Sequence, residues 1–330
     1  MTLHLCFMVE GRRDAQVISP VLAEVFERLR GRGFRVDVLA AEHAALRPDL
    51  LAATRDLYLL KSDTELALSL AGILHAHEAR ILNPYWNCLA AKDKIAASRR
   101  LHAGGIPAPR CWATTDPELL RPAVEEVPLV IKPYRGFHGN GVRKVATPDE
   151  LSAVPRTDAP VLAQEFVEGT GEDLKIYVVG DRVFATRKPF SACSYLVAGR
   201  QCPVSAEVRD VALRCGEVFG LGLYGLDVVE GLGGPYVVDV NYFPGCKDIP
   251  EAPRTLADYI GDYAHGRRWL PLAGPIVPAD TAAEPVSVDL AGGEPRGGRE
   301  VSPPIGNGAF AAPITGPLAA SPRSPVGPSA

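Results

Sequence analysis

The chain has 330 residues, of which 47% are hydrophobic and 22% are charged, and its formal net charge is −4. These values indicate a globular protein of about two domains and exclude a broad polyanion-binding surface, so we expect no nucleic-acid partner. The seven cysteines are scattered without Cys-x-x-Cys spacing, which favours a reducing compartment over a disulfide framework. Because the sequence shows neither a signal-peptide pattern nor an apolar run that could span a bilayer, it predicts a cytoplasmic protein without membrane contact.

Residues 1–105 alternate between apolar strands and helices with one apolar face. The expected strands occupy 3–9, 34–39, 56–60 and 79–82, and the expected helices occupy 17–29 and 64–77. Strands that alternate with helices in this way form a parallel sheet. The sequence therefore predicts an N-terminal α/β domain of three or four parallel strands.

Two loops of this domain carry candidates for binding an anionic substrate. Ligands gather at the carboxyl ends of parallel strands, and the loops expected there contain Arg12, Arg13 and Lys61. A solvated basic loop is the other interpretation of Arg12 and Arg13. A further helix begins near Lys94 and ends at a pair of glycines, so we place the first domain boundary near residue 105.

A glycine-rich segment follows the buried strand expected at 129–131, which finishes at Lys132. The segment contains one histidine and three glycines, namely His138, Gly136, Gly139 and Gly141. Glycines let backbone N–H groups approach a phosphate closely. A buried lysine is costly without an anion, so a phosphate partner explains Lys132 better than a structural role does. The histidine either contacts phosphate or acceptor, or is an ordinary loop residue.

The hairpin expected at 223–247, with halves at 222–229 and 235–245, carries an oxygen-only group of side chains. Asp239 and Asn241 are two residues apart, so in a strand they point to the same face. Asp227 lies on the paired strand. Such a set suits Mg²⁺, which takes few protein ligands and completes its shell with water and phosphates. Acids that face solvent at strand ends are the alternative interpretation.

The remaining segments complete the predicted layout. A strand is expected at 161–166, a hairpin at 174–187 with its turn at Gly180-Asp181, and helices at 205–219 and 253–264. After residue 270, Pro, Gly, Ala and Ser predominate and no apolar period remains. This composition predicts a disordered tail over 271–330.

The motifs, taken together, resemble those of ATP-grasp enzymes over residues 81–264. The residues that carry the resemblance come in the same order: Lys94, Lys132, the 136–141 glycine segment, Glu165, Asp227, Asp239 and Asn241. The resemblance implies an α/β protein with the ATP-grasp fold, in which ATP lies between two β-sheet lobes. A lid lobe at 106–166 and a C-terminal lobe at 167–270 would follow an N-terminal domain, 1–105, on the acceptor side.

Two branches of the superfamily compete. The stretch 164–181 resembles the RimK-like carboxylate–amine ligases, whereas 239–245 resembles the inositol polyphosphate kinases. The first hypothesis is a ligase that forms an acyl phosphate from ATP and a carboxylate and then an amide with an amine co-substrate. The second is a kinase for an inositol-phosphate type of polyol, and the third is a non-catalytic ATP-binding protein.

The resemblance also implies roles for individual residues. ATP would be held by the lysines, the glycine segment, the adenine-reading main chain and a ribose-binding acid, namely Lys94, Lys132, Gly136, His138, Gly139, Gly141, Glu165, Phe166, Val167 and Asp173. One or two Mg²⁺ ions, with Mn²⁺ as an alternative, would bind Asp227, Asp239 and Asn241. Lys175 and Arg187 are the candidates for stabilising charge on the transferred phosphoryl group. The small-molecule acceptor would meet Arg12, Lys61 and Gly245.

Overall fold

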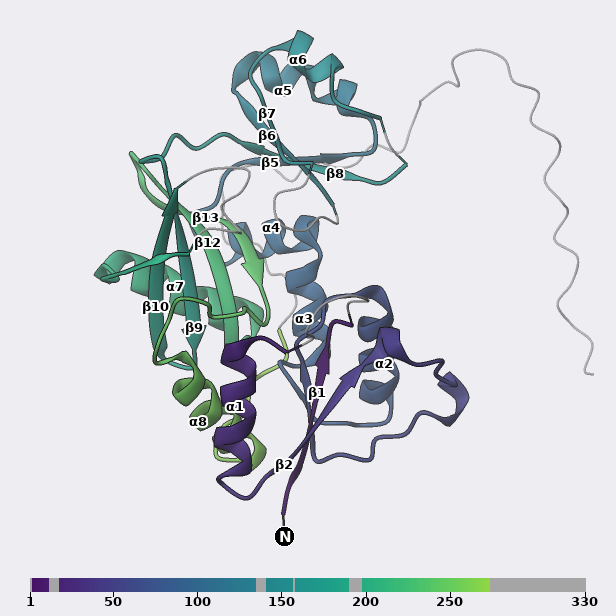
Figure 1. Cartoon of the computed structure of the whole chain (residues 1–330). Coiled ribbons are helices and arrows are strands. Elements are labelled where there is room, and N and C mark those ends of the chain that lie inside the picture. The colour runs from purple at the N-terminus through teal and green to yellow at the C-terminus, as the bar shows by residue number, and fades with distance from the viewer. Residues whose placement is uncertain (1, 12–17, 135–140, 157, 190–197, 274–330) are drawn as a thin grey trace, which may run out of the picture. The chain divides into compact units, whose positions relative to one another are not determined.

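A parallel four-stranded sheet forms the N-terminal part of the computed structural model, which describes residues 2–11, 18–134, 141–156, 158–189 and 198–273. The strand order is β2-β1-β3-β4 (Figure 1), with the bounds β1 His4–Val9, β2 Arg35–Ala40, β3 Leu57–Leu60 and β4 Ile81–Leu82. β1 and β3 are almost entirely apolar because helices and other elements cover both faces of a parallel strand. The predicted parallel sheet is confirmed.

Helices α1 (Pro20–Arg30) and α2 (Glu65–Ala76) cover this sheet. Each begins at a hydroxyl cap, because the side chains of Ser19 and Thr64 accept a backbone N–H from the first turn. Two short 3₁₀ helices, Ala41–His43 and Pro48–Leu50, lie between β2 and β3. Each helix carries an apolar stripe that packs on the strands, which is the physical reason for the predicted alternation of strands and helices.

Helices α3 (Tyr85–Lys92) and α4 (Lys94–Ala103) follow β4 and meet at Asp93. The Asp93 carboxylate accepts the N–H groups of Ile95 and Ala96 at 3.0 and 2.9 Å. This N-cap fixes where α4 begins, and therefore where its first residue stands. The sequence predicted α4 but not α3.

An antiparallel sheet in the order β5-β8-β6-β7 forms a separate lobe. Its elements are β5 Cys111–Thr114, a 3₁₀ helix Pro117–Leu120, α5 Arg121–Glu126, β6 Leu129–Pro133, β7 Arg143–Val145, α6 Pro148–Ser152 and β8 Val161–Glu165. The lobe has a small hydrophobic core of its own, in which Leu129, Ile131 and Ala163 are at most 2% exposed. It is the lobe expected to act as the lid.

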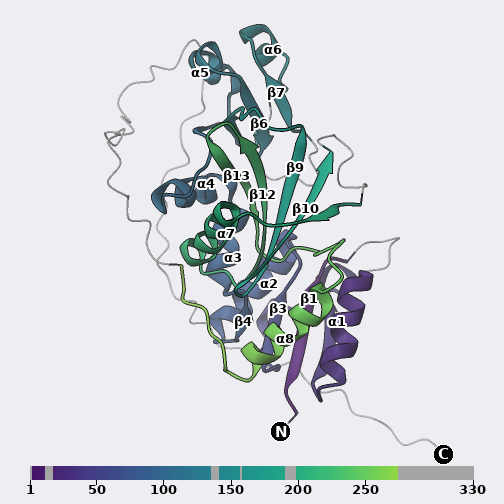
Figure 2. The same cartoon turned by 90° about the vertical axis from the view of Figure 1, so that its left-hand side faces the viewer.

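A second antiparallel sheet, in the order β11-β10-β9-β12-β13, forms the C-terminal lobe. Its elements are β9 Glu172–Val179, β10 Arg182–Pro189, β11 Arg200–Cys202, α7 Ala206–Phe219, β12 Leu223–Gly231, β13 Gly234–Asn241 and α8 Ala252–Ala264. Both predicted hairpins are present, β9–β10 and β12–β13. One face of the sheet is apolar and packs against α7, which leaves the other face for polar side chains (Figure 2).

One continuous hydrophobic core joins the N-terminal sheet to the C-terminal lobe. It contains buried residues of β1, β3, β9, β12 and β13 as well as of the helices around them. Helix α8 lies beside α1 in both views (Figure 1, Figure 2). The first and last helices that the structure describes are therefore packed together.

Asn83, directly after β4, fastens the two sheets to each other. Its side chain is fully buried and makes four hydrogen bonds to backbone groups of the C-terminal lobe. The amide nitrogen donates to the carbonyls of Leu223 and Tyr242, and the amide oxygen accepts the N–H groups of Gly222 and Leu223. No other residue type of this size offers two donors and an acceptor in one plane.

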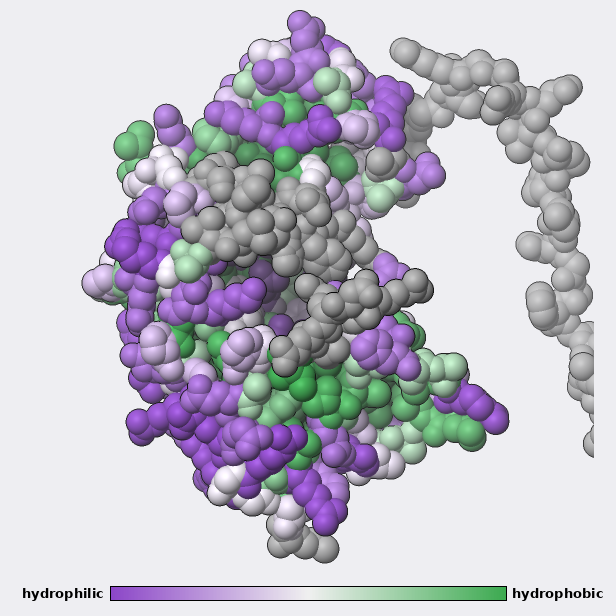
Figure 3. Space-filling model, viewed as in Figure 1, coloured by the Kyte–Doolittle hydropathy of each residue, from purple (hydrophilic) through white to green (hydrophobic). Residues whose placement is uncertain are grey.

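The described chain ends at Ala273, and Asn87 holds its last residues. The Asn87 amide donates to the Pro271 carbonyl at 2.9 Å and accepts the Ala273 N–H at 2.8 Å. The predicted tail therefore begins three residues inside the described part, and 274–330 lie outside it. On the face shown in Figure 3, hydrophobic residues gather over the N-terminal part of the chain. Within the described ranges, no helix combines the length and apolarity needed to cross a bilayer.

We expect Asn83→Leu to lower the free energy of unfolding by at least about 3 kcal/mol, because several buried backbone groups lose their partners and each costs roughly 1–3 kcal/mol. Urea denaturation followed by circular dichroism measures the change. Gln201→Leu on the exposed strand β11 is the matched control. A loss for Asn83→Leu no larger than that of the control would contradict this role.

Candidate functional site

Two carboxylates face each other across the β12–β13 hairpin. Asp227 and Asp239 are direct partners in the register, and Lys175 on β9 is the partner of Asp227 on its other side. Partners in neighbouring antiparallel strands lie on the same face, with Cβ atoms about 5 Å apart. Two like charges at that distance repel each other, so the pair needs cations close by.

Each carboxylate has its own lysine. Lys94 is the first residue of α4. Its ammonium donates to both carboxylate oxygens of Asp239, at 2.9 and 2.8 Å. Lys175 lies 2.6 Å from Asp227. All four side chains are 18–31% exposed, so water screens these ion pairs only in part. Lys94, predicted to bind phosphate, and Asp239, predicted to bind metal, are therefore in direct contact.

A β-bulge in β13 shapes this site. Asp227 pairs with Asp239 but Val228 pairs with Val237, which leaves Val238 as the extra residue. Its carbonyl accepts a hydrogen bond of 3.1 Å from the Lys132 ammonium. Lys132 belongs to β6 of the lid lobe, so this bond crosses from one sheet to the other. In a regular β-ladder the Val238 carbonyl would accept a hydrogen bond from the neighbouring strand, whereas in the bulge it accepts one from Lys132.

Electrostatics tie the three lysines to the two acids. Burial lowers the pKa of Lys132, against the attraction of Asp239. Burial alone would raise the pKa of Asp239, but Lys94 and Lys132 outweigh it and hold that pKa below its ordinary value. For Lys175, Asp227 outweighs burial and raises the pKa. The cluster is thus a charged one, with ammonium and carboxylate groups in each other's field.

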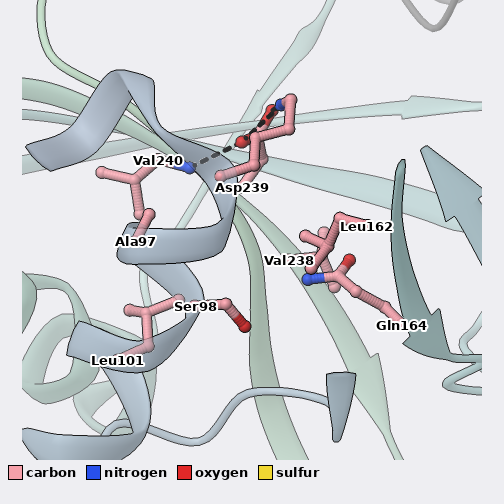
Figure 4. Close-up of a pocket in the computed structure, with 9 residues that line it drawn as sticks. Ala97, Ser98, Leu101, Leu162, Gln164, Val238, Asp239 and Val240 are labelled. Atoms are coloured by element: carbon pink, nitrogen blue, oxygen red, sulfur yellow. Dashed lines mark hydrogen bonds and ion pairs between the residues drawn. The ribbon is translucent and has the colours of Figure 1, made fainter. Parts of the chain in front are cut away.

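A narrow pocket adjoins the Lys94–Asp239 pair (Figure 4). Figure 4 shows helix α4 on one side, and Val238 with Leu162 and Gln164 of β8 on the other. The walls are largely apolar, while Gln164 and Ser98 are buried polar groups. The pocket lies where α4, the lid lobe and β13 meet.

The start of the glycine-rich segment is tied to this end of α4. The Tyr134 hydroxyl donates to Asp93 Oδ2 at 2.8 Å, and Asp93 is the cap that positions Lys94. Gly141, at the far end of the segment, has φ +77°, and a Cβ there would lie 2.7 Å from Pro133. Only glycine fits that position. Arg12, Gly136, His138 and Gly139 lie outside the described residues.

The structure does not bring Arg187 to the cluster. Arg187 pairs with Leu174 in the β9–β10 register, and Leu174 faces the core on the opposite side from Lys175. Its guanidinium binds Glu230 at 2.5 Å instead. The next residue, Lys188, alternates to the face of Lys175, is 8% exposed in its side chain and lies 3.6 Å from Asp248. Pairing the residues of the two strands outward from the Gly180-Asp181 turn would have placed Lys188 on the same face as Lys175.

The other nucleotide candidates occupy the edges of the two sheets. Asp173 lies 3.9 Å from Lys175, and burial raises its pKa. The Glu165 carboxylate binds Arg110, and the Phe166 N–H donates to the Pro128 carbonyl. The site face of the C-terminal sheet thus presents Asp173, Lys175, Asp227 and Asp239 in neighbouring strands.

The acceptor candidates lie beyond the carboxyl ends of β3 and β13. Lys61 directly follows β3, and its ammonium lies 5.6 Å from the centre of the Phe243 ring. Gly245 is exposed in the turn after β13, which we call the 242–248 turn. The Tyr242 hydroxyl donates to the Ser62 carbonyl at 2.8 Å. The N-terminal sheet therefore meets the C-terminal lobe at the end of the metal-candidate strand.

The metal candidates fit a hard cation but not a soft one. Asp227, Asp239 and Asn241 offer only oxygen donors, the type that Mg²⁺ prefers. Asn241 is exposed and lies one pair further along the strands, opposite Gly225. No cluster of three or more His, Cys, Asp and Glu side chains suited to a metal occurs in the described part of the chain. Two lysines now neutralise the acids, the role a metal would take over.

Solved structures share this fold. A RimK domain ATP-grasp protein from Sphaerobacter thermophilus aligns with a TM-score of 0.62 at 21% identity, over 78% of this chain and 99% of that one. The ATP-grasp ligase PsnB, whose structure contains a minimal precursor, Mg and ADP, aligns with a TM-score of 0.59 at 21% identity, over 79% of this chain and 98% of that one. At these identities the likeness establishes the ATP-grasp fold.

Curated relatives match about half of this chain. A probable alpha-L-glutamate ligase of Shewanella loihica is 32% identical over 177 residues, which are 49% of this chain and 59% of that protein. Probable alpha-L-glutamate ligase 1 of Hahella chejuensis is 33% identical over 49% of this chain and 58% of that protein. The chain thus spans less than three fifths of the length of either relative. A family model for the RimK-like ATP-grasp domain matches residues 91–258, just over half of the 330 residues, and the chain therefore belongs to the RimK-like ATP-grasp domain family.

Proposed function

We propose that the protein is an ATP-dependent carboxylate–amine ligase. The observation that carries the proposal is the cluster of Lys94, Lys132 and Lys175 around Asp227 and Asp239, built at the junction of the lobes of a RimK-like ATP-grasp fold. Three ammonium groups suit a triphosphate, and two carboxylates suit its metal. The names of the relatives favour ligation, and nothing in them favours the kinase alternative.

Nucleotide binding would exchange the partners within this cluster. The phosphates would take Lys94 and Lys132. The Glu165 carbonyl and the Val167 N–H would read the adenine edge, because the N–H groups of Glu165 and Phe166 already donate to the carbonyls of Arg110 and Pro128. Asp173 is the candidate for the ribose hydroxyls. Since the lysines and acids already neutralise each other, the exchange keeps every buried charge paired.

Asp227, Asp239 and Asn241 would hold the metal. A bound Mg²⁺ offsets the charge of the phosphates and orients them. The protein's own contribution is the β12–β13 register, which places two carboxylates side by side. The bulge at Val238 keeps Lys132 over the same strand.

The proposed reaction has two steps. A substrate carboxylate oxygen attacks the γ-phosphorus of ATP, the bond to the β-phosphate oxygen breaks, and ADP leaves. An amine then attacks the acyl phosphate carbonyl, inorganic phosphate leaves, and the amine loses a proton to give the amide. Lys175 and Lys188 are the candidates for stabilising the transferred phosphoryl group, because both face the site side of β9 and β10.

The division of labour follows the predicted domains. Residues 106–270 would hold ATP, with 106–166 as the lid, and residues 1–105 would contact the acceptor.

Because the relatives are named alpha-L-glutamate ligases, L-glutamate is the first amine to test. Peptide acceptors come second, since PsnB was solved with a minimal precursor. A substrate panel assayed for ADP release, with mass detection of amide products, tests the proposal; ADP formed with a carboxylate but never an amide would contradict it.

Asp239→Asn should reduce amide formation by at least about a hundredfold, since disturbing even the outer shell of a metal site costs about 10- to 100-fold. The overall fold should survive, because the substitution keeps the shape of the side chain. Initial rates at saturating Mg-ATP measure the effect. Asp210→Asn on the surface of α7 is the control. Unchanged amide formation in Asp239→Asn would contradict metal binding by Asp239 and would favour a different metal site.

Lys175→Met should lower kcat by about a hundredfold, the size of effect expected when one preorganised charge is removed from a transition state. Arg187→Met should leave kcat near the wild-type value, because its guanidinium faces the other side of the sheet. Lys175→Arg should restore part of the rate, and circular dichroism should show that each variant is folded. Equal losses in the methionine variants of both residues would contradict the assignment.

A further inference from the structure

Lys61 is a partly buried cation without an acidic partner among the residues that the structure describes. Its ammonium lies over the Phe243 ring, and it forms no ion pair with any described residue. Burial is the main influence on its pKa and lowers it. A ring face attracts an ammonium more weakly than a carboxylate does, so the Phe243 ring does not replace an acidic partner. The position is therefore one that an anion would stabilise.

A second lysine stands nearby. Lys247 is exposed in the 242–248 turn, the same turn whose Phe243 ring lies 5.6 Å from the Lys61 ammonium. It too forms no ion pair with any described residue. Two ammonium groups that repel each other, on loops from different sheets, make a site for a shared anion.

The 242–248 turn is held in a costly conformation. Cys246 and Asp248 have φ values of 47° and 67°, in the left-handed region that non-glycine residues seldom adopt. The turn is fastened at both ends, by Tyr242 to the Ser62 carbonyl and by Asp248 to the Gly199 N–H at 2.8 Å. Strain that the surroundings maintain in this way is typical of binding sites.

The surroundings limit the kind of anion. Glu10 and Asp63 also act on Lys61, and Asp63 binds Lys92 at 2.6 Å. Their negative charges disfavour a polyphosphate but allow a single carboxylate. The reacting carboxylate must lie beside Lys175 and Asp227, on the C-terminal sheet, whereas Lys61 follows a strand of the N-terminal sheet.

We propose that Lys61 and Lys247 bind a non-reacting carboxylate of the amino-acid substrate. This contact anchors the substrate at the end of β13. The inference rests on the proposed ligase function, which it deepens by naming the class of substrate group. The Phe243 ring would shield the carboxylate from water on one side. Arginine is not needed for this task, because a lysine recognises a carboxylate as a point charge.

The first experiment measures equilibrium binding of L-glutamate and of ADP to the full chain in the presence of Mg²⁺, by titration calorimetry. Lys61→Met should weaken L-glutamate binding by about 10- to 100-fold, the range for loss of a charge-assisted hydrogen bond, and leave ADP binding unchanged. Lys247→Met should have a smaller effect, and Lys61→Arg should restore part of the affinity. Arg30→Met, which removes a cation from the Phe26 ring on α1, is the matched control.

Several results would overturn the inference. They are unchanged L-glutamate binding in Lys61→Met, an equal loss of ADP binding, and no L-glutamate binding to the wild type. L-Glutamine and L-isoglutamine each lack one of the two carboxylates of L-glutamate, so the analogue that binds more weakly identifies the anchored carboxylate. If each analogue binds equally well to the wild type and to Lys61→Met, the inference is also contradicted. Binding that depends on Lys61 in a protein that forms no amide would separate this site from the proposed function.

A second measurement needs no substitution. Acetic anhydride acetylates accessible neutral lysines, and peptide mass spectrometry reports the rate at each position. L-Glutamate should slow acetylation of Lys61 several-fold, while exposed Lys144 on β7 serves as the internal reference. Equal rates at Lys61 with and without L-glutamate would contradict the proposal even if Lys61→Met fails to fold.

Discussion

The repulsion between Asp227 and Asp239 is the constraint on which this structure depends. The hairpin register forces the two carboxylates to face each other, and they are tolerated because lysines approach them from α4, β6 and β9. Those three elements belong to different parts of the chain, so charge balance at one point determines how a helix and two sheets meet. A site assembled in this way is organised before any ligand arrives, which reduces the reorganisation that binding requires.

Much of this site follows from strand alternation and turn chemistry. The spacing of Asp239 and Asn241, the two hairpins and the strand that ends at Lys132 are local features, and the structure has each of them. The helices expected at 17–29, 64–77 and 205–219 likewise match α1, α2 and α7 to within a few residues. Local rules work here because each element buries one regular face.

What the sequence did not reveal depends on long-range geometry. The bulge at Val238 is specified by how β13 meets its neighbours, and Asn83 gains its meaning only from backbone groups about 140 residues away. Helix α3 and the short elements of the lid lobe have too few residues to show a period. Arg187 is different, because the turn at Gly180-Asp181 fixes the register and points instead to Lys188.

The pairing of α1 with α8 has a consequence for how the chain folds. The N-terminal helix finds its neighbour more than 200 residues later, and Arg32 binds Asp258 across that interval. Contacts of such high sequence separation slow folding, because loop-closure entropy must be overcome before they form. During synthesis, the surface of α1 that packs against α8 therefore stays uncovered until α8 has emerged. Apolar surface that is exposed for the time needed to complete the chain favours aggregation.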